Sequence, residues 1–151
     1  MIRYVSSMVT FAEIPTEVTL SLAISGCLNR CFGCHSPELR KDIGNELSDE
    51  ILDQLIRDND GITCVLLLGE GNDPTRLIQL AERVRSNGLA VALYSGRDEI
   101  EEELWKKFDY IKIGSWNYKL GPLNQRTTNQ RLYKVVGKER IDITDRFWYE
   151  K

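Results

Sequence analysis

Short apolar runs alternate with amphipathic stretches along most of the chain. In residues 17–25 apolar side chains alternate with smaller or polar ones, which is the period of a β-strand. Residues 62–68 form a continuous apolar run between two glycines, a pattern typical of a strand that is covered on both faces. Three further strands are predicted at 89–94, 109–113 and 131–136.

Three amphipathic segments fall between these predicted strands. The first begins at Ser48, which can cap a helix, and acidic residues follow in its first turn, where the helix dipole favours them. The second begins at Asp73, a capping residue that is followed by Pro74 at the first helical position. The third covers residues 98–108. Strands that alternate with helices in this way indicate parallel strands joined by right-handed crossovers.

The length of the chain limits the architecture. With 151 residues the chain can bury one core, and we expect residues 1–151 to form a single domain. A closed barrel of eight strand-helix units needs at least about 200 residues. The predicted fold is therefore α/β, a partial open (β/α) barrel of about five mostly parallel strands, with the loops at the carboxyl ends of the strands gathered at one edge.

Composition excludes several classes of function. The net charge of -3 provides no basic field, which argues against a nucleic-acid partner. No apolar run reaches the roughly 18 residues that a membrane span needs, and residues 1–14 lack the apolar core of a signal peptide. We therefore expect a soluble, cytoplasmic protein whose clustered cysteines stay reduced.

Three cysteines directly after the first predicted strand carry the strongest chemical signal. Cys27, Cys31 and Cys34 have the spacing C-x3-C-x2-C and supply three thiolates, whereas a structural zinc or a fully ligated iron-sulfur cluster usually takes four protein ligands. A centre with one open position can bind and activate another molecule. Two alternatives stay open, a zinc site completed by His35 and a fourth ligand from Cys64. The position of Cys64 well inside a predicted strand favours a buried apolar thiol.

Two other loops are predicted at the same edge of the sheet. Gly69-Glu70-Gly71 follows the strand at 62–68, and Ser95-Gly96-Arg97 follows the strand at 89–94. The glycines are also compatible with a plain tight turn. A polar loop of 17 residues, 114–130, is long enough to be functional or ordered by a partner. The aromatic tail at 147–149 serves either core packing or docking.

These motifs together resemble the radical S-adenosylmethionine superfamily. Within it, the chain is most similar to the small glycyl-radical activating enzymes that serve anaerobic ribonucleoside-triphosphate reductases. The resemblance covers roughly residues 18–135. Four stretches carry it, namely Ser-Gly-Cys at 25–27 with Cys-Phe-Gly-Cys at 31–34, His-Ser-Pro-Glu at 35–38, Tyr-Ser-Gly at 94–96 and Thr-Asn-Gln-Arg at 128–131.

The resemblance implies a specific chemistry. Cys27, Cys31 and Cys34 would hold a [4Fe-4S] cluster, and the amino and carboxylate groups of S-adenosyl-L-methionine would bind the fourth iron. The enzyme would be an anaerobic oxidoreductase that cleaves the sulfonium to methionine and a 5'-deoxyadenosyl radical. That radical would take hydrogen from a glycine of the partner, the large subunit of the anaerobic ribonucleotide reductase. A flavodoxin- or ferredoxin-type protein would donate the electron.

The resemblance also implies which residues contact S-adenosylmethionine. They are Gly33, His35, Gly69, Glu70, Ser95 and Lys112. Gly69 and Glu70 would bind the methionine amino group, and backbone at Gly33 together with His35 would contact adenine. The strand pattern does not tell whether Lys112 faces the site, because both of its neighbours are isoleucines. The chain departs from the superfamily at Gly33, where many members have an aromatic residue, and at the turn 68–71, which usually begins with two glycines.

Three alternatives remain from the sequence. The chain could activate another glycyl-radical enzyme, such as a formate lyase or a decarboxylase, although those activators are usually longer and often carry extra cysteines. It could be a non-catalytic metal-binding or electron-transfer module whose centre is indifferent to S-adenosylmethionine. It could also be a degenerate member that only docks to a partner, for which the altered turn at 68–71 would be the sign.

Overall fold

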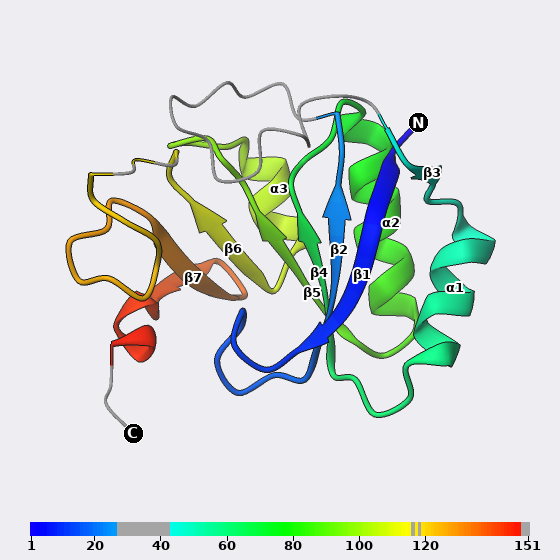
Figure 1. The fold of residues 1–151 in the computed structure, drawn as a ribbon, viewed down its shortest axis with the longest axis horizontal. Helices are drawn as coiled ribbons and strands as arrows, with labels where there is room; N and C mark the ends of the chain where they lie inside the picture. Colours follow the sequence, from blue (N-terminus) through cyan, green and yellow to red (C-terminus); the bar gives the residue numbers. More distant parts are fainter. Residues whose placement is uncertain (27–42, 116, 118, 149–151) are drawn as a thin grey trace.

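The computed structural model describes residues 1–26, 43–115, 117 and 119–148 (Figure 1). In this part of the chain, one mixed sheet has the strand order β3-β1-β2-β4-β5-β6-β7-β8. The strands are β1 (Arg3–Thr10), β2 (Thr19–Ile24), β3 (Asn45–Glu46), β4 (Cys64–Leu68), β5 (Ala90–Tyr94), β6 (Tyr110–Ile113), β7 (Arg131–Val136) and β8 (Glu139–Asp142). The helices are α1 (Asp49–Asp58), α2 (Pro74–Ser86) and α3 (Glu102–Lys107), and a 3-10 turn, η2, covers Thr144–Phe147.

The predicted partial barrel of about five mostly parallel strands is wrong. Among the described strands, parallel pairing is confined to β2, β4, β5 and β6, and the sheet continues with antiparallel strands on both sides. The reason lies in the connections. A parallel pair needs a crossover of a dozen or more residues, usually a helix, whereas a short turn can join only antiparallel strands. Short links join β1 to β2 and β7 to β8, so the sheet is extended by hairpins.

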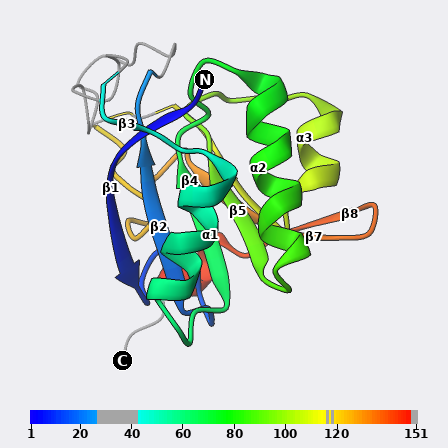
Figure 2. The same cartoon turned by 90° about the vertical axis from the view of Figure 1, so that its right-hand side faces the viewer.

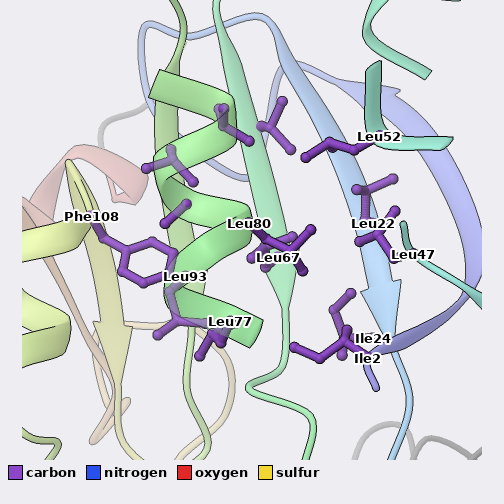
Figure 3. Close-up of a cluster of buried hydrophobic side chains, with 14 of the residues drawn as sticks. Ile2, Leu22, Ile24, Leu47, Leu52, Leu67, Leu77, Leu80, Leu93 and Phe108 are labelled. Carbon is purple, nitrogen blue, oxygen red and sulfur yellow. The ribbon is translucent and has the colours of Figure 1, made fainter. Parts of the chain in front are cut away.

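The three helices cover one face of the sheet (Figure 2). Alternate strand residues such as Leu22, Leu67 and Leu93 point to this face, where Leu77 and Leu80 of α2 pack against them (Figure 3). Both leucines of α2 are fully buried, as are those of the strands. The apolar periodicity that predicted α1 and α2 is therefore the pattern that forms this core.

Loops cover the other face, which we call the helix-free face. Cys64 and Leu66 of β4 point to it and belong to a second apolar cluster. The cluster is closed by Ile14 of the β1–β2 loop, Leu123 of the loop between β6 and β7, and Ile143 just before η2. Phe147 packs against the same cluster, and the indole N–H of Trp148 donates to the carbonyl of Leu123 at 2.9 Å. The described part of the aromatic tail is thus packed against the domain.

The helix starts follow the predicted caps in two cases of three. Ser48 Oγ accepts the Ile51 N–H at 3.2 Å at the start of α1, and Asp73 Oδ1 accepts the Arg76 N–H at 3.1 Å at the start of α2. The third helix begins at Glu102 rather than near Asp98. The Asp98 carboxylate accepts the backbone N–H of Ser115 instead, at 3.0 Å. No helix among the described residues is both long enough and apolar enough to cross a bilayer.

Gly114, directly after β6, should tolerate no side chain. Its φ is +113°, a Cβ there would lie 2.9 Å from Cα of Gln130, and its N–H donates to the Arg97 carbonyl at 2.7 Å. Gly88 also has a left-handed φ, +76°, but nothing lies within 4 Å of an added Cβ. We expect Gly114→Ala to lower the free energy of unfolding by about 1–3 kcal/mol more than Gly88→Ala, because only the first variant adds a backbone clash to the backbone strain. Urea unfolding of both variants measures the difference, and equal losses would contradict the packing described.

Candidate functional site

Four parallel strands place their carboxyl ends in one row. Ala23 of β2 pairs with Leu68 of β4, Leu68 pairs with Tyr94 of β5, and Tyr94 pairs with Lys112 of β6. The loops that follow these strands therefore leave the sheet at the same edge (Figure 1). Backbone hydrogen bonds continue beyond the row, from Gly69 N–H to the Tyr94 carbonyl at 3.0 Å and from Ser95 N–H to the Lys112 carbonyl at 2.8 Å.

The Glu70 carboxylate joins the loops after β4 and β5. Arg97 Nε donates to Glu70 Oε2 at 2.9 Å, and Arg97 Nη2 donates to Oε1 at 2.6 Å. Ser95 Oγ donates to Oε2 at 2.5 Å and accepts the Arg97 N–H at 3.1 Å. A planar guanidinium that bonds both oxygens of a carboxylate fixes the orientation of that carboxylate as well as its position. Ser95 is fully buried, so this contact has little competition from water.

Arg97 binds a second carboxylate at the start of α3. Its Nη1 and Nη2 donate to the two oxygens of Glu101 at 2.9 and 2.7 Å. The hydrogen bonds that Arg97 donates to Glu101 and Glu70 hold the pKa of Arg97 above its usual range, and the same bonds to Glu101 lower the pKa of that carboxyl to about 2. Two carboxylates around one guanidinium leave the cluster with a formal charge of -1. Arg97 was predicted to lie in a converging loop but without a partner, since nothing in its neighbourhood along the chain identifies Glu70 as one.

A cleft of about 260 Å³ opens beside this cluster, between the loops and the helices α2 and α3. Glu70, Arg97 and Glu101 line it together with apolar side chains of the helices, among them Leu77 and Leu104. Sites that enclose a drug-sized ligand measure roughly 300–1,000 Å³. The described cleft has the size for part of such a ligand, and its charged wall favours a cationic group.

Lys112 points to the helix-free face. Its Nζ lies 5.0 Å from the centroid of the Tyr94 ring, on the same face of the sheet. Tyr94 donates its hydroxyl hydrogen to the carbonyl of Glu13, and burial raises the pKa of this tyrosine well above its usual value. The orientation of Lys112, which the sequence left undecided, is thus set by the pleat of β6.

The predicted cluster ligands Cys27, Cys31 and Cys34 lie outside the described residues, as do Gly33 and His35. Among the residues that are described, no group of three or more histidine, cysteine or acidic side chains could hold a metal ion.

Ser25 and Ile43, which flank the segment 27–42, are described and are held together. Ser25 Oγ donates to the Ile43 carbonyl at 2.5 Å and accepts the Ile43 N–H at 3.2 Å. The backbone N–H of Ser25 donates to the Arg3 carbonyl at 3.0 Å. The cysteine segment therefore starts and ends at one point, next to β1 and at the edge that carries Glu70.

No model of a known protein family matches this chain, and neither does a curated protein or a solved structure. The interpretation of this edge accordingly depends on its residues and their contacts.

The stretch 128–131, one of the four that carry the resemblance, closes the loop between β6 and β7. Asn129 Nδ2 donates to the Ser115 carbonyl at 3.0 Å, and Gln130 Nε2 donates to the Gly114 carbonyl at 3.3 Å. Gln130 is buried. These two amides hold the loop in place at the same edge of the sheet as Arg97, whose carbonyl bonds Gly114.

Cys64 is a free and fully buried thiol. It pairs with Thr19 and Ala90 at the far end of β4 from Gly69. Burial, followed by the negative charge of Glu17, raises the pKa of Cys64 to about 12. Its full burial at the end of β4 opposite Gly69 and Glu70 keeps it away from the edge at which the cysteine segment begins. Its position inside β4 agrees with the buried apolar thiol expected from the sequence.

The raised pKa predicts that native Cys64 resists alkylation. At pH 8 a pKa of about 12 leaves roughly one thiolate in 10,000, whereas a pKa near 9.0, the ordinary value, leaves about one in ten. We expect iodoacetamide to label the Cys64 peptide at least ~100-fold more slowly in the native protein than in urea, as measured by mass spectrometry.

The same shift predicts alkaline destabilisation. Because the native pKa lies above the unfolded value, the neutral thiol stabilises the fold below pH 9.0, and this contribution is lost as the pH rises towards about 12. Cys64→Ala should therefore lose less stability than the unmodified protein between these two pH values. Two results would show that Cys64 is exposed to solvent. One is fast labelling of the native protein, and the other is a loss of stability at alkaline pH that is as steep in Cys64→Ala as in the unmodified protein.

Proposed function

We propose that the chain is a radical S-adenosylmethionine enzyme that installs the glycyl radical of an anaerobic ribonucleoside-triphosphate reductase. One observation carries the proposal. The segment that contains Cys27, Cys31 and Cys34 begins and ends at the edge of the sheet at which the Glu70 carboxylate is fixed by Arg97. A three-thiolate segment and an oriented carboxylate at one edge are what is needed to hold a metal centre and the amino group of its ligand.

The donor set suits an iron-sulfur cluster with one open iron. Cys27, Cys31 and Cys34 would hold a [4Fe-4S] cluster, because thiolates are the usual ligands of such clusters. Cys64, the competing fourth ligand, is disfavoured because it is fully buried at the end of β4 opposite Gly69 and Glu70. When bound, the cluster would supply one electron to the sulfonium of S-adenosylmethionine, whose products are methionine and a 5'-deoxyadenosyl radical that takes a hydrogen atom from the glycine of the reductase.

The protein's own residues would bind and orient the cofactor. The Glu70 carboxylate would accept a hydrogen bond from the methionine amino group, next to the backbone of Gly69. Ser95 would act through Glu70, because its hydroxyl already donates to that carboxylate and accepts the Arg97 N–H. Lys112, on the helix-free face beside Tyr94, would contact the part of the cofactor that lies on that side. Gly33 and His35 would contact adenine, as the resemblance implies.

The partners are proposed from the resemblance alone. They are the large subunit of the anaerobic ribonucleotide reductase, which would carry the glycine, and a flavodoxin- or ferredoxin-type electron donor. The shape of the fold adds nothing here, since the sheet is not the unfinished barrel whose wide mouth would have suited a folded substrate.

Reconstitution without oxygen tests the proposal. The protein should gain the broad visible absorbance of an iron-sulfur cluster and, after reduction with dithionite, convert S-adenosylmethionine to 5'-deoxyadenosine and methionine, both measured by chromatography. Alanine at Cys27, Cys31 or Cys34 should abolish the absorbance, because each removes one of three ligands. Cys64→Ala is the matched control and should retain it.

Two results would contradict the proposal. One is a colourless zinc protein that is saturated by its own side chains. The other is an intact cluster that leaves S-adenosylmethionine unchanged both alone and with the reductase present. If the cofactor is cleaved but no glycyl radical appears in the spectrum of the reductase, another glycyl-radical partner replaces the one proposed.

A further inference from the structure

Glu101 departs from the usual local pattern of a helix start. It occupies the N-cap position of α3, where an acidic side chain usually caps the helix, yet in the described structure it makes no such cap bond. Both of its carboxylate oxygens bind Arg97 instead. The helix gives up a local stabilising contact, and the guanidinium gains a second carboxylate, which shares its Nη2 with Glu70. Such a departure from local preference is typical of functional sites.

Arg97, which is bound to Glu101 through Nη1 and Nη2, holds Glu70 in one orientation. Glu70 Oε2 accepts two hydrogen bonds, from Arg97 Nε and Ser95 Oγ, whereas Oε1 accepts one, from Arg97 Nη2. A carboxylate has about four lone-pair sites. The described contacts therefore leave acceptor capacity on Oε1, in a residue that lines the cleft.

The net charge of Glu70, Arg97 and Glu101 determines which ligand group can donate a hydrogen bond to Oε1. Glu70 and Glu101 together outweigh Arg97, so a carboxylate or phosphate group of a ligand would be repelled, whereas an ammonium group would be attracted. An ammonium group also has N–H donors, and Oε1 can accept a hydrogen bond from one of them.

We propose that Arg97, supported by Glu101, is a positioning residue that turns Glu70 towards the α-amino group of S-adenosylmethionine. This inference rests on the proposed function. Arg97 touches neither the amino group nor the reacting atoms. It acts through Glu70, and it makes the site select ligands that carry an α-amino group.

The test is equilibrium binding to the reconstituted protein that carries its cluster. Two probes are used, S-adenosylmethionine and its analogue without the α-amino group, and the unmodified protein should prefer the first. Arg97→Lys keeps the positive charge but loses the planar fork. We expect it to bind S-adenosylmethionine about tenfold or more weakly, the usual effect of losing one charge-assisted hydrogen bond, and to bind the analogue within about threefold of the unmodified protein.

A double-mutant comparison tests whether Arg97 acts through Glu70. Glu70→Gln combined with Arg97→Lys should bind S-adenosylmethionine no more weakly than Glu70→Gln alone, because the positioned group is already absent. Glu101→Gln is a second, milder variant, and it should reduce the preference for the amino group by roughly three- to tenfold. Glu103→Gln changes a charge in the same cleft and is the control, with binding expected within about threefold of the unmodified protein.

The outcomes separate this inference from the function on which it rests. If the unmodified protein binds neither probe, the proposed function fails. If it prefers S-adenosylmethionine, and Arg97→Lys and Glu101→Gln keep that preference, only the positioning role fails. Equal weakening of both probes in Arg97→Lys would mean that Arg97 merely ties two loops together, and this result would also overturn the inference.

Discussion

The parallel pairing of β2, β4, β5 and β6 is the constraint on which the rest of the structure depends. Because Ala23, Leu68, Tyr94 and Lys112 lie in one row, the next few residues of each strand emerge at the same level of the sheet. A shift of the register by one residue would exchange the two faces of a strand. The contact between Glu70 and Arg97, 27 positions apart in the sequence, exists only in this register.

The sequence allowed the middle of the fold to be predicted because its signals there are local. Ser48 and Asp73 cap the first two helices as expected, and the strands at β4, β5, β6 and β7 follow their apolar runs. The first strand, β1, was not predicted, because most of its residues are exposed and show no alternation. The outer strands can either close the sheet into a barrel or extend it as hairpins. The choice depends on long-range strand pairing, which the hydrophobic periodicity of the sequence does not indicate.

The residues of the candidate site also differ in whether the sequence could identify them. The strand pattern placed the loops of Glu70 and Ser95 at one edge, and the resemblance made these two residues candidates; the loops do lie side by side in the structure. Arg97 could not be assigned a role, because its two partners are identified only once β4, β5 and α3 are placed together.

The two faces of the sheet also differ in a way that hydropathy does not reveal. The helix-free face holds Cys64, Tyr94 and Tyr110, and burial raises the pKa of each, so these three groups stay protonated to a higher pH than they would in water.

The outer strand β1 has a consequence for the behaviour of the protein in solution. Its pairing with β3 involves only Arg3 and Tyr4, so within the described residues the backbone of 6–10 is paired on one side alone. Met8 is 64% exposed and Phe11, just beyond the strand, is 74% exposed. An outer strand that exposes apolar side chains, and whose described backbone is paired on one side alone, is a template for intermolecular β-sheet. Concentrated samples are therefore expected to self-associate through this border first, and a lysine at position 8 is the natural choice for keeping them monodisperse.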